Sequence, residues 1–333
     1  MLEAPAFAKP MVFVAAFDPT VTHHREARLN IRFIATSLAL LTLCTASIPA
    51  QSAIRLRVDN DAFNFWQPPW SRPDEEFSSG VRLSADVAGP AFWMKRGGAT
   101  EHTWTLGQDI FTAARTASQP TPPPGSRPDA GFLFLQNLQR VGQLDRLDET
   151  SITLGVTGEP SLASSTQRIV HGFTAAWQRP IDWSHQLPFE PKLNVAYDQT
   201  RRRGSRSIEV NPHAGASLGN LLTEVRAGIG ARTGWHLSHP WMSTTPQSRV
   251  AFAVTTDAML RAVAWNGTLS GDTFRSSQHV TLRPFVREYQ LGFSARIDRA
   301  TLAYVVNQRS AEYTTRSAAH QWSSLQTQWQ FTW

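Results

Sequence analysis

The end of the chain, Gln321–Trp333, alternates between apolar and polar side chains with a period of two. Successive side chains of a β-strand point to opposite faces, so this pattern predicts a strand with one apolar and one polar face. The apolar face includes the aromatic residues Trp329 and Trp333. The same alternation recurs over 221–232 and 285–297, in segments about as long as the 9–11 residues that a strand needs to cross a membrane.

The polar faces of these segments indicate which kind of sheet they form. They are rich in Gln, Ser, Thr, Gly and Arg, as in the interior of a membrane barrel, and the segments are long for a soluble sandwich. A closed barrel is the strand arrangement that satisfies every backbone group within lipid. We therefore predict an all-β fold, a transmembrane antiparallel β-barrel of about twelve strands, since bacterial barrels have even strand numbers.

The predicted strands follow the alternating segments at 54–64, 77–88, 102–112, 131–141, 150–158, 190–201, 206–217, 221–232, 249–263, 283–297, 300–313 and 321–333. With both chain ends on the periplasmic side, strand parity places these connections outside the cell: 65–76, 113–130, 159–189, 264–282 and 314–320. The inner connections are 89–101, 142–149, 202–205, 233–248 and 298–299. Of these, 233–248 is longer than periplasmic turns usually are.

The start of the sequence predicts export. Basic residues precede an apolar run, Phe33–Cys44, and small residues follow it. This order is typical of a secretory signal peptide, and the run is too short to span a membrane as a helix. We therefore predict a leader or mis-assigned start at 1–24, a signal peptide at 25–53 and the barrel at 54–333. Because Cys44 is the sole cysteine, no disulfide is expected in the mature chain.

The composition narrows the range of partners. Charged residues make up 17% of the chain, against about 25% in ordinary soluble domains. The formal net charge is +6, yet export and a lipid-facing fold argue against nucleic acid as a partner. The alternating last strand with its terminal aromatic residue resembles the signal that the outer-membrane barrel assembly machinery reads. We therefore expect that machinery as a partner and the bacterial outer membrane as the location.

The first predicted hairpin carries the polar groups best placed for chemistry. Its first strand ends with Asn60 and Asp61, and its second strand begins with Ser78 and Ser79. Amide, carboxylate and hydroxyl groups therefore gather at one end of the hairpin. Taken alone, the stretch is more simply interpreted as a hairpin with a polar tip.

The longest outer connection differs from the others because it contains helical periodicity. Over 166–177, apolar residues such as Ile169 and Phe173 recur at the spacing of one helix face. We predict a short helix there, and it contains His171. A histidine on a loop helix is more often structural than functional. Parity, however, puts this helix on the same side of the membrane as the polar end of the first hairpin, which favours a functional role.

Short segments spread over nearly the whole mature chain resemble one family, the outer-membrane lipid A 3′-O-deacylases (LpxR-like proteins). They are Val58–Asp61, Phe77–Leu83, Leu106–Thr112, Arg127–Leu133, Leu154–Pro160, Gln167–His171, Asp182–Leu187 and Trp265–Leu269, together with the final strands. The resemblance implies a twelve-stranded barrel that removes the 3′-linked acyloxyacyl group of lipid A by calcium-dependent ester hydrolysis. It implies lipid A in lipopolysaccharide as the substrate, Ca²⁺ as the cofactor and outer-membrane lipids as the surroundings.

Carried over by position, the resemblance implies roles for several residues. His171 would be the general base that activates water. Asn60 and Asp61 would hold calcium and orient the site, and Ser78 would lie beside them. This is chemically coherent, because a neutral imidazole can take a proton from water near pH 7. Calcium prefers carboxylate, amide and carbonyl oxygens, and it can polarise an ester carbonyl.

The sequence departs from the family pattern just after its predicted base. The family has a catalytic carboxylate a few residues beyond the histidine, whereas 172–178 contain none here. Asp182 and Glu190 are the nearest carboxylates downstream. Asp59 or Glu76 of the first hairpin could substitute.

Two other functions stay open at this point. The chain could be an outer-membrane phospholipase with a different substrate, or a catalytically silent barrel. Arg72, Arg115, Arg127 and Arg275 lie in outer segments and could grip the phosphates of lipid A, which favours the deacylase. An open pore is disfavoured, because a barrel of about twelve strands with charged side chains inside is narrow.

Overall fold

The computed structural model describes residues 51–65, 67, 76–87, 99–114, 122–174, 182–205, 207–241 and 248–332, apart from the side chains of 51, 52, 99, 170–174 and 332. The chain divides into two units, Met1–Thr45 and Ala46–Trp333, and every described residue belongs to the second. The leader at 1–24 and the signal peptide up to residue 50 lie outside the described residues, so they stay predictions.

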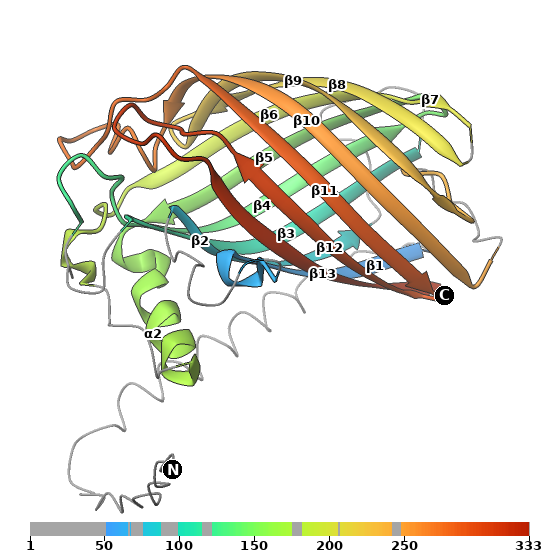
Figure 1. Cartoon of the computed structure of the whole chain (residues 1–333), viewed down its shortest axis with the longest axis horizontal. Helices are drawn as coiled ribbons and strands as arrows, with labels where there is room; N and C mark the ends of the chain where they lie inside the picture. The colour runs from blue at the N-terminus through green and yellow to red at the C-terminus, as the bar shows by residue number, and fades with distance from the viewer. Residues whose placement is uncertain are drawn as a thin grey trace, which may run out of the picture. The chain divides into compact units, whose positions relative to one another are not determined.

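The described strands form one antiparallel sheet that closes on itself (Figure 1). In chain order they are β1 Gln51–Asn60, β2 Glu76–Val87, β3 Ala99–Thr112, β4 Ala130–Gly142, β5 Arg146–Thr157, β6 Pro191–Arg201, β7 Arg203–Gly204, β8 Ile208–Gly219, β9 Leu222–Trp235, β10 Val250–Asn266, β11 Phe285–Ile297, β12 Ala300–Arg309 and β13 His320–Thr332. The first and last strands pair, and β6 pairs with β8, so each long strand described has two neighbours. This closure confirms the predicted transmembrane β-barrel.

Each predicted strand corresponds to one long strand, whereas the short β7, which pairs with β8, is not predicted by the sequence. The helical segments are η1 Asp61–Phe63, η3 Glu159–Ser161, α2 Ala163–Thr174 and η4 Trp183–His185. The helix expected at 166–177 is α2, and it begins earlier, at Ala163. Its start follows Leu162, whose left-handed backbone ends η3 and redirects the chain. No helix within the described ranges is long and apolar enough to cross a membrane.

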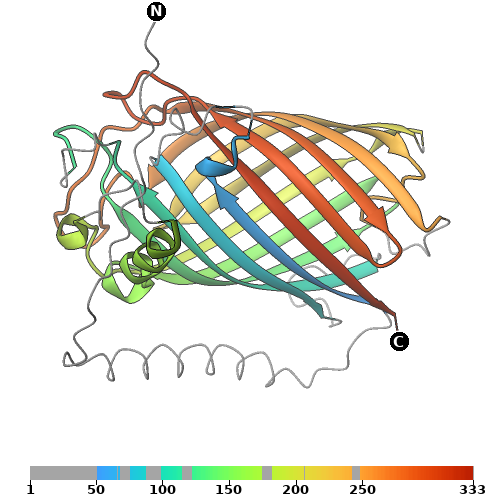
Figure 2. The same cartoon turned by 60° about the horizontal axis from the view of Figure 1, so that its bottom comes forward.

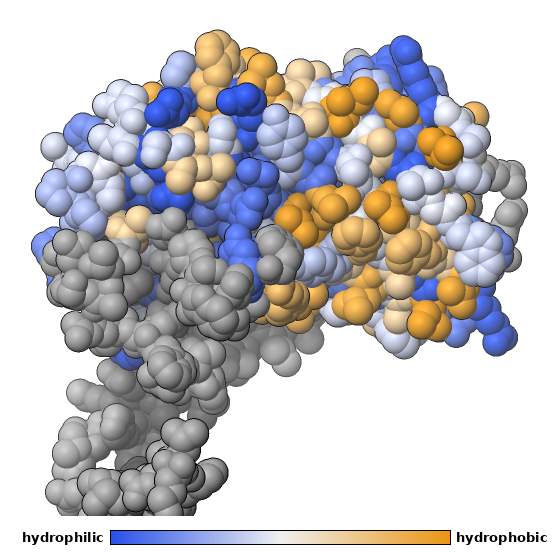
Figure 3. All heavy atoms as spheres, viewed as in Figure 1, coloured by the Kyte–Doolittle hydropathy of each residue, from blue (hydrophilic) through white to orange (hydrophobic). Residues whose placement is uncertain are grey.

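Alternation along β1 separates a lipid face from a lumen face. Ile54 and Leu56 are exposed on the outside, while Arg57 and Asp59 lie on the other face and pair with each other. Many large apolar side chains of the other strands are exposed in the same way. Figure 3 shows them gathered over the strands, whereas the loop end, at the left of the view, is more polar. An apolar outer band around a closed sheet is the surface that a bilayer surrounds.

Ion pairs between neighbouring strands fill much of the lumen. Arg261 on β10 donates to Glu224 on β9 at 2.7 Å and to Glu288 on β11 at 3.3 Å. Arg309 on β12 donates to the same Glu288 at 2.9 Å. Further pairs join Arg82 with Asp59 and Asp109, Arg226 with Asp198 and Glu224, Arg140 with Glu149, Arg146 with Asp148, and Arg202 and Arg232 with Glu209. Such pairing offsets the cost of withdrawing charges from water.

The long inner connection after β9 reaches a distant turn. Trp241 donates from Nε1 to the carbonyl oxygen of Gln143 at 2.7 Å, and a ring nitrogen of His239 lies 2.9 Å from the carbonyl oxygen of Leu144. Gln143 and Leu144 belong to the turn between β4 and β5, which β6 and β8 separate from β9 in the sheet. The unusual length of 233–248 therefore has a structural reason, since this connection spans part of the inner end of the barrel.

Two phenylalanines of the lumen pack against glycines on the neighbouring strands. Phe132 and Phe134 on β4 stack with ring centroids 5.0 Å apart. A Cβ atom added at Gly107 on β3 would overlap the Phe134 ring, and one at Gly155 on β5 would overlap the Phe132 ring. The absence of a side chain at these glycines therefore leaves the space that the two rings occupy.

Replacing Gly107 by Ala is expected to destabilise the barrel, because the added methyl group occupies the space of the Phe134 ring. Overpacking of this kind costs about 1–3 kcal/mol. The measurement is the temperature at which the purified, folded barrel loses its heat-modifiable migration in gel electrophoresis. The second substitution Phe134→Leu is expected to recover part of the loss.

Gly230→Ala is the matched control for this test. A Cβ atom at Gly230 first meets the flexible carboxylate of Asp257, at 3.1 Å. Equal losses for the two alanine variants would contradict the steric role of the ring.

Candidate functional site

The predicted hairpin residues gather where β1 ends and η1 begins. Asn60 is the N-cap of η1, and its side-chain oxygen accepts the backbone N–H of Ala62 at 2.7 Å. Asparagine is favoured at such positions because its oxygen satisfies a donor of the first helical turn. Asp61 follows as the first residue of η1, and it is only 3% exposed. The cap therefore fixes where η1 begins and how Asp61 is positioned relative to β1.

Ser78 is the extra residue of a β-bulge. The register between β2 and β3 shifts between Phe77 and Ser79, which leaves Ser78 outside the regular pairing. Its buried hydroxyl forms a hydrogen bond with the hydroxyl of Thr112. On the other side of β2, Ser79 pairs with Asn60. The bulge therefore brings a re-aimed hydroxyl close to the end of β1, and bulges are frequent beside active sites.

The helix α2 is held at the outer ends of β3 and β4. Gln108 on β3 donates from its side chain to the carbonyl oxygen of Ser161, at 2.6 Å. Gly131, near the start of β4, leaves room for the side chains of Ser161 and Ala163. Figures 1 and 2 show α2 and η1 toward the same end of the barrel, away from the C-terminus. The helix that contains His171 thus lies at the end that carries the hairpin residues.

His171 falls within α2, as predicted, and its side chain lies outside the described residues. One helical turn earlier, the side chain of Gln167 is buried and accepts the indole N–H of Trp183 at 2.8 Å. Residues four apart share a helix face. The hydrogen bond from Trp183 therefore fixes the position of the helix face on which both Gln167 and His171 lie.

The carboxylate Asp59, a possible substitute for the missing family carboxylate, already has strong partners. It is fully buried and accepts Arg57 at 2.8 Å, together with Arg82 and the hydroxyl of Ser324. A carboxylate that balances two guanidinium groups in the lumen is poorly suited to orient an imidazole on an outer loop.

The other hairpin carboxylate, Glu76, is the centre of a buried cluster that joins the outer loops. We call it the rim hub, and it consists of Glu76, Arg127, Thr268, Tyr313 and Arg316. Glu76 accepts Arg127 at 3.3 Å and Arg316 at 3.0 Å. It also accepts the hydroxyl of Tyr313 at 2.7 Å, and Arg127 donates to Thr268 at 3.1 Å. Burial and the negative charge of Glu76 raise the pKa of Tyr313 to about 12, so the phenol remains a donor at neutral pH.

Arg127 connects the rim hub to the Ser78 bulge. Its guanidinium lies over the ring of Phe111, 4.5 Å from the centroid. Phe111 precedes Thr112, the hydrogen-bond partner of Ser78, so Arg127 contacts both strands beside that pair. Glu76 has a φ of 65°, which is strained for a residue with a side chain, and the hub contacts hold it there. Because Arg127 is 1% exposed, it does not face lipid phosphates as its position in the sequence suggests.

The downstream carboxylates also have other partners. Asp182 caps η4 by accepting the N–H of Ser184 at 2.9 Å. Glu190 contacts the ammonium group of Lys192. Burial opposes ionisation of Glu190, but Lys192 and the backbone N–H of Thr273 outweigh it and lower the pKa of this carboxyl group. Each of the four candidate carboxylates therefore has partners of its own.

The donor set proposed for calcium fits the chemistry of that ion. Asp61 offers a buried carboxylate and Asn60 an amide oxygen, and both are hard oxygen ligands. Within the part of the chain that the structure describes, no group of three or more His, Cys, Asp or Glu side chains is arranged to hold a metal ion. Calcium takes about 6–8 oxygens, so carbonyls, water or substrate would supply the rest. Calcium binding here stays a prediction.

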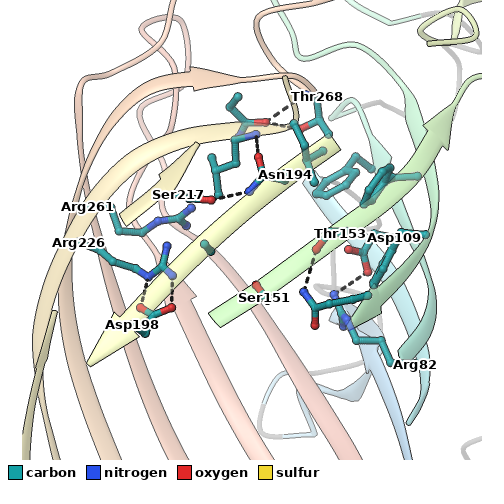
Figure 4. A pocket seen from close by; sticks show the side chains of 18 of the residues that line it. Arg82, Asp109, Ser151, Thr153, Asn194, Asp198, Ser217, Arg226, Arg261 and Thr268 are labelled. Carbon is teal, nitrogen blue, oxygen red and sulfur yellow. Dashed lines mark hydrogen bonds and ion pairs between the residues drawn. The ribbon is translucent and has the colours of Figure 1, made fainter. Parts of the chain in front are cut away.

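A cavity of about 490 Å³ lies in the lumen (Figure 4). Its walls carry the stacked Phe132 and Phe134 and ion pairs such as Arg226 with Asp198. Arg127 and Thr268 of the rim hub also line it, so the hub borders this cavity. The predicted hairpin residues do not line the cavity, which is therefore distinct from the candidate site.

Sequence reasoning missed Thr112, and it gave Arg127 the different role of gripping lipid phosphates. Both fall in segments that resemble the deacylase family, Leu106–Thr112 and Arg127–Leu133, and that resemblance is the signal that could have found them. Their contacts with the hairpin depend on strand register and on loop packing, which alternation alone does not reveal.

Comparisons with known proteins agree with this architecture. A family model described as outer membrane protein LpxR matches residues 33–331. Among solved structures, the chain is similar to LpxR from Salmonella typhimurium, at 17% identity over 83% of this chain and 99% of that chain, with a TM-score of 0.69. The beta domain of the Bordetella autotransporter BrkA aligns at 12% identity over 85% and 100% of the two chains, with a TM-score of 0.45. No protein with a curated function matches the sequence.

The likeness to the Salmonella structure shows a shared fold, and the family match spans most of the chain. Together with the closed sheet and its apolar outer band, they confirm the resemblance seen in the sequence and the location in the outer membrane. The chain belongs to the outer membrane protein LpxR family.

Proposed function

We propose that the chain is a lipid A 3′-O-deacylase that hydrolyses the ester of the 3′-linked acyloxyacyl group. Membership of the LpxR family supports an outer-membrane lipid A deacylase at the level of the family. The observation that best supports the finer proposal is positional. The helix that contains His171 lies toward the end of the barrel that carries η1. The bulge at Ser78 is next to Ser79, which pairs with Asn60 at that end of β1.

In the proposed reaction, water attacks the carbonyl carbon of the ester. His171 takes a proton from that water as the new C–O bond forms, and it returns the proton to the sugar 3′-oxygen as the old C–O bond breaks. The products are a free carboxylic acid and a 3′-hydroxyl group. Ser78 would donate a hydrogen bond to the ester. A calcium ion held by Asn60 and Asp61 would polarise the carbonyl group.

The surroundings of the site suit a lipid of the outer leaflet. Ile169 on α2 is 52% exposed, and Phe65, just after η1, is 60% exposed. Exposed apolar side chains at the end of a membrane barrel can rest against acyl chains. Arg275 is exposed and able to meet a phosphate, whereas Arg72 and Arg115 lie outside the described residues.

Replacing His171 by Ala is expected to lower acyl release by about 10²–10⁴-fold, the usual contribution of a general base. Mass spectrometry of lipid A from cells that produce the wild type or the variant measures retention of the 3′-acyloxyacyl group. His213→Ala is the matched control, because His213 pairs with Asp257 in the lumen at 2.8 Å and lies on a strand away from the site.

The products that the wild type forms distinguish between the functions that the sequence leaves open. Release of fatty acid from phospholipid, with lipid A left intact, would make the chain a phospholipase. A folded wild-type barrel that cleaves neither lipid would be a silent barrel, and the proposal would be wrong.

Replacing Asp61 by Asn is expected to raise the calcium concentration that gives half-maximal acyl release, because the variant loses the charged protein ligand. In the wild type, a chelator is expected to stop acyl release and added Ca²⁺ to restore it. The assay uses purified barrel, purified lipid A in detergent and a series of free calcium concentrations. Full wild-type activity in the chelator would refute the calcium part and leave the role of His171 standing.

Replacing Arg127 by Met is expected to lower the maximal rate about tenfold or more, because Glu76 and the Ser78 bulge lose their common support. Arg140→Met is the control, since it breaks the lumen ion pair in which Nε of Arg140 lies 2.8 Å from Oε1 of Glu149. This pair lies toward the other end of the barrel. Both variants cost stability, because Arg127→Met leaves the buried carboxylate of Glu76 less well paired and Arg140→Met does the same to the half-buried Glu149. Equal losses of activity per folded barrel would show that Arg127 has no special relation to the site.

A further inference from the structure

Asp272, in the outer loop between β10 and β11, is a buried carboxylate that lacks a hydrogen-bond donor. Its side chain is fully withdrawn from water, and neither carboxylate oxygen has a hydrogen-bond partner among the described residues. Arg275 approaches it with Nε at 3.7 Å, and that side chain is 56% exposed and also donates to the carbonyl oxygen of Phe189. Burying a carboxylate in this state is strongly unfavourable, so the group requires a further partner.

A second buried carboxylate, Glu190, lies beside Asp272 on the segment that enters β6, because it accepts the backbone N–H of Thr273, the residue that follows Asp272. Its Oε2 contacts the ammonium group of Lys192. Its Oε1 accepts the backbone N–H of Thr273 at 3.0 Å and lies 3.5 Å from Nδ2 of Asn220. Glu190 is therefore fixed in place and its charge is balanced by Lys192, whereas Asp272 has no comparable partner.

The buried groups at this junction carry an excess of negative charge. Asp272 and Glu190 are acidic, Lys192 is the one buried base described beside them, and the charge of Arg275 is screened by solvent. Burial, followed by the charge of Glu190, raises the pKa of Asp272. Two carboxylates at close quarters are stable when a proton or a cation lies between them.

The loop around Asp272 is rich in the oxygens that favour a cation. The hydroxyl of Ser277 accepts the backbone N–H of Asp272 at 2.7 Å. Gly271, with a φ of 81°, lets the chain pass close to that hydroxyl and to the carbonyl oxygen of Gln278. Carboxylate, hydroxyl and carbonyl oxygens in a flexible arrangement match calcium better than magnesium, which demands near-ideal octahedral geometry.

We propose that Asp272 and Glu190 bind one Ca²⁺ ion, which fastens the loop between β10 and β11 to the segment that enters β6. This site lies at β6 and β10, whereas Asn60 and Asp61 lie between β1 and β2. It rests on no part of the proposed deacylase activity, and its test does not use that activity.

Terbium luminescence tests the site, because Tb³⁺ occupies oxygen-rich calcium sites and emits when a nearby tryptophan is excited. Trp265 donates to the carbonyl oxygen of Asn220 at 3.0 Å, which puts an antenna next to Glu190. The purified barrel carries Asp61→Asn so that the proposed catalytic ion does not contribute. We expect one equivalent of Tb³⁺ to bind and to be displaced by Ca²⁺, and we expect Asp272→Asn to weaken binding at least tenfold.

Two further variants complete the design. Trp265→Phe is expected to lower the emission while equilibrium dialysis still finds one bound ion, which ties the signal to this junction. Asp257→Asn, which alters a lumen carboxylate paired with His213, is expected to bind as the parent does. Glu190→Gln repeats the test if Asp272→Asn fails to show heat-modifiable migration, the sign of a folded barrel.

The proposal is wrong if the parent barrel binds no ion, or if Asp272→Asn binds as tightly as the parent. In either case a proton, and not a cation, joins the two carboxylates. The raised pKa then means that the parent loses stability as the pH rises through the folded-state pKa of Asp272. Asp272→Asn would remove that alkaline loss.

Discussion

Closure of the sheet is the constraint on which the rest of the structure depends. Because β1 pairs with β13 and β6 with β8, no long strand described leaves a backbone edge in lipid. Closure also encloses one face of every strand in a narrow lumen. Polar side chains there must satisfy one another's charges and hydrogen bonds. The result is a series of ion pairs that runs from Arg226 through Glu224, Arg261 and Glu288 to Arg309. The ion pairs are thus a consequence of the barrel and of the membrane around it.

The regular pairing of the strands is interrupted at the outer end of β1 and β2. The left-handed backbone of Glu76 and the bulge at Ser78 lie two residues apart on β2, and the cap residue Asn60 pairs with the next residue, Ser79. Departures of this kind need support from their surroundings, which the rim hub supplies through Arg127. The hub joins the first residue of β2 to residues from the loops that follow β3, β10 and β12, so the shape of the candidate site depends on several loops at once.

The sequence was sufficient to predict the barrel because each strand carries its own alternating signal, as 321–333 does for β13. Parity alone then placed the helix with His171 and the first hairpin at one end. The remaining features depend on residues far apart in the chain. Ser78 meets Thr112 only because the register slips by one residue, and a slip of one residue exchanges the two faces of a strand. Two partners of Asp59, Arg82 and Ser324, and the partners of Glu76 likewise come from other strands and loops, so these contacts could not be seen in the sequence.

The shared ion pairs of the lumen bear on how such a barrel can change during evolution. Glu288 serves both Arg261 and Arg309, and Glu224 serves both Arg226 and Arg261. A single replacement in this series of ion pairs leaves a charged neighbour without its partner, away from water. Acceptable changes therefore have to arrive together, and selection opposes the intermediates. We therefore expect the interior charges to change together during evolution, whereas exposed residues of the rim can change one at a time on an unchanged scaffold.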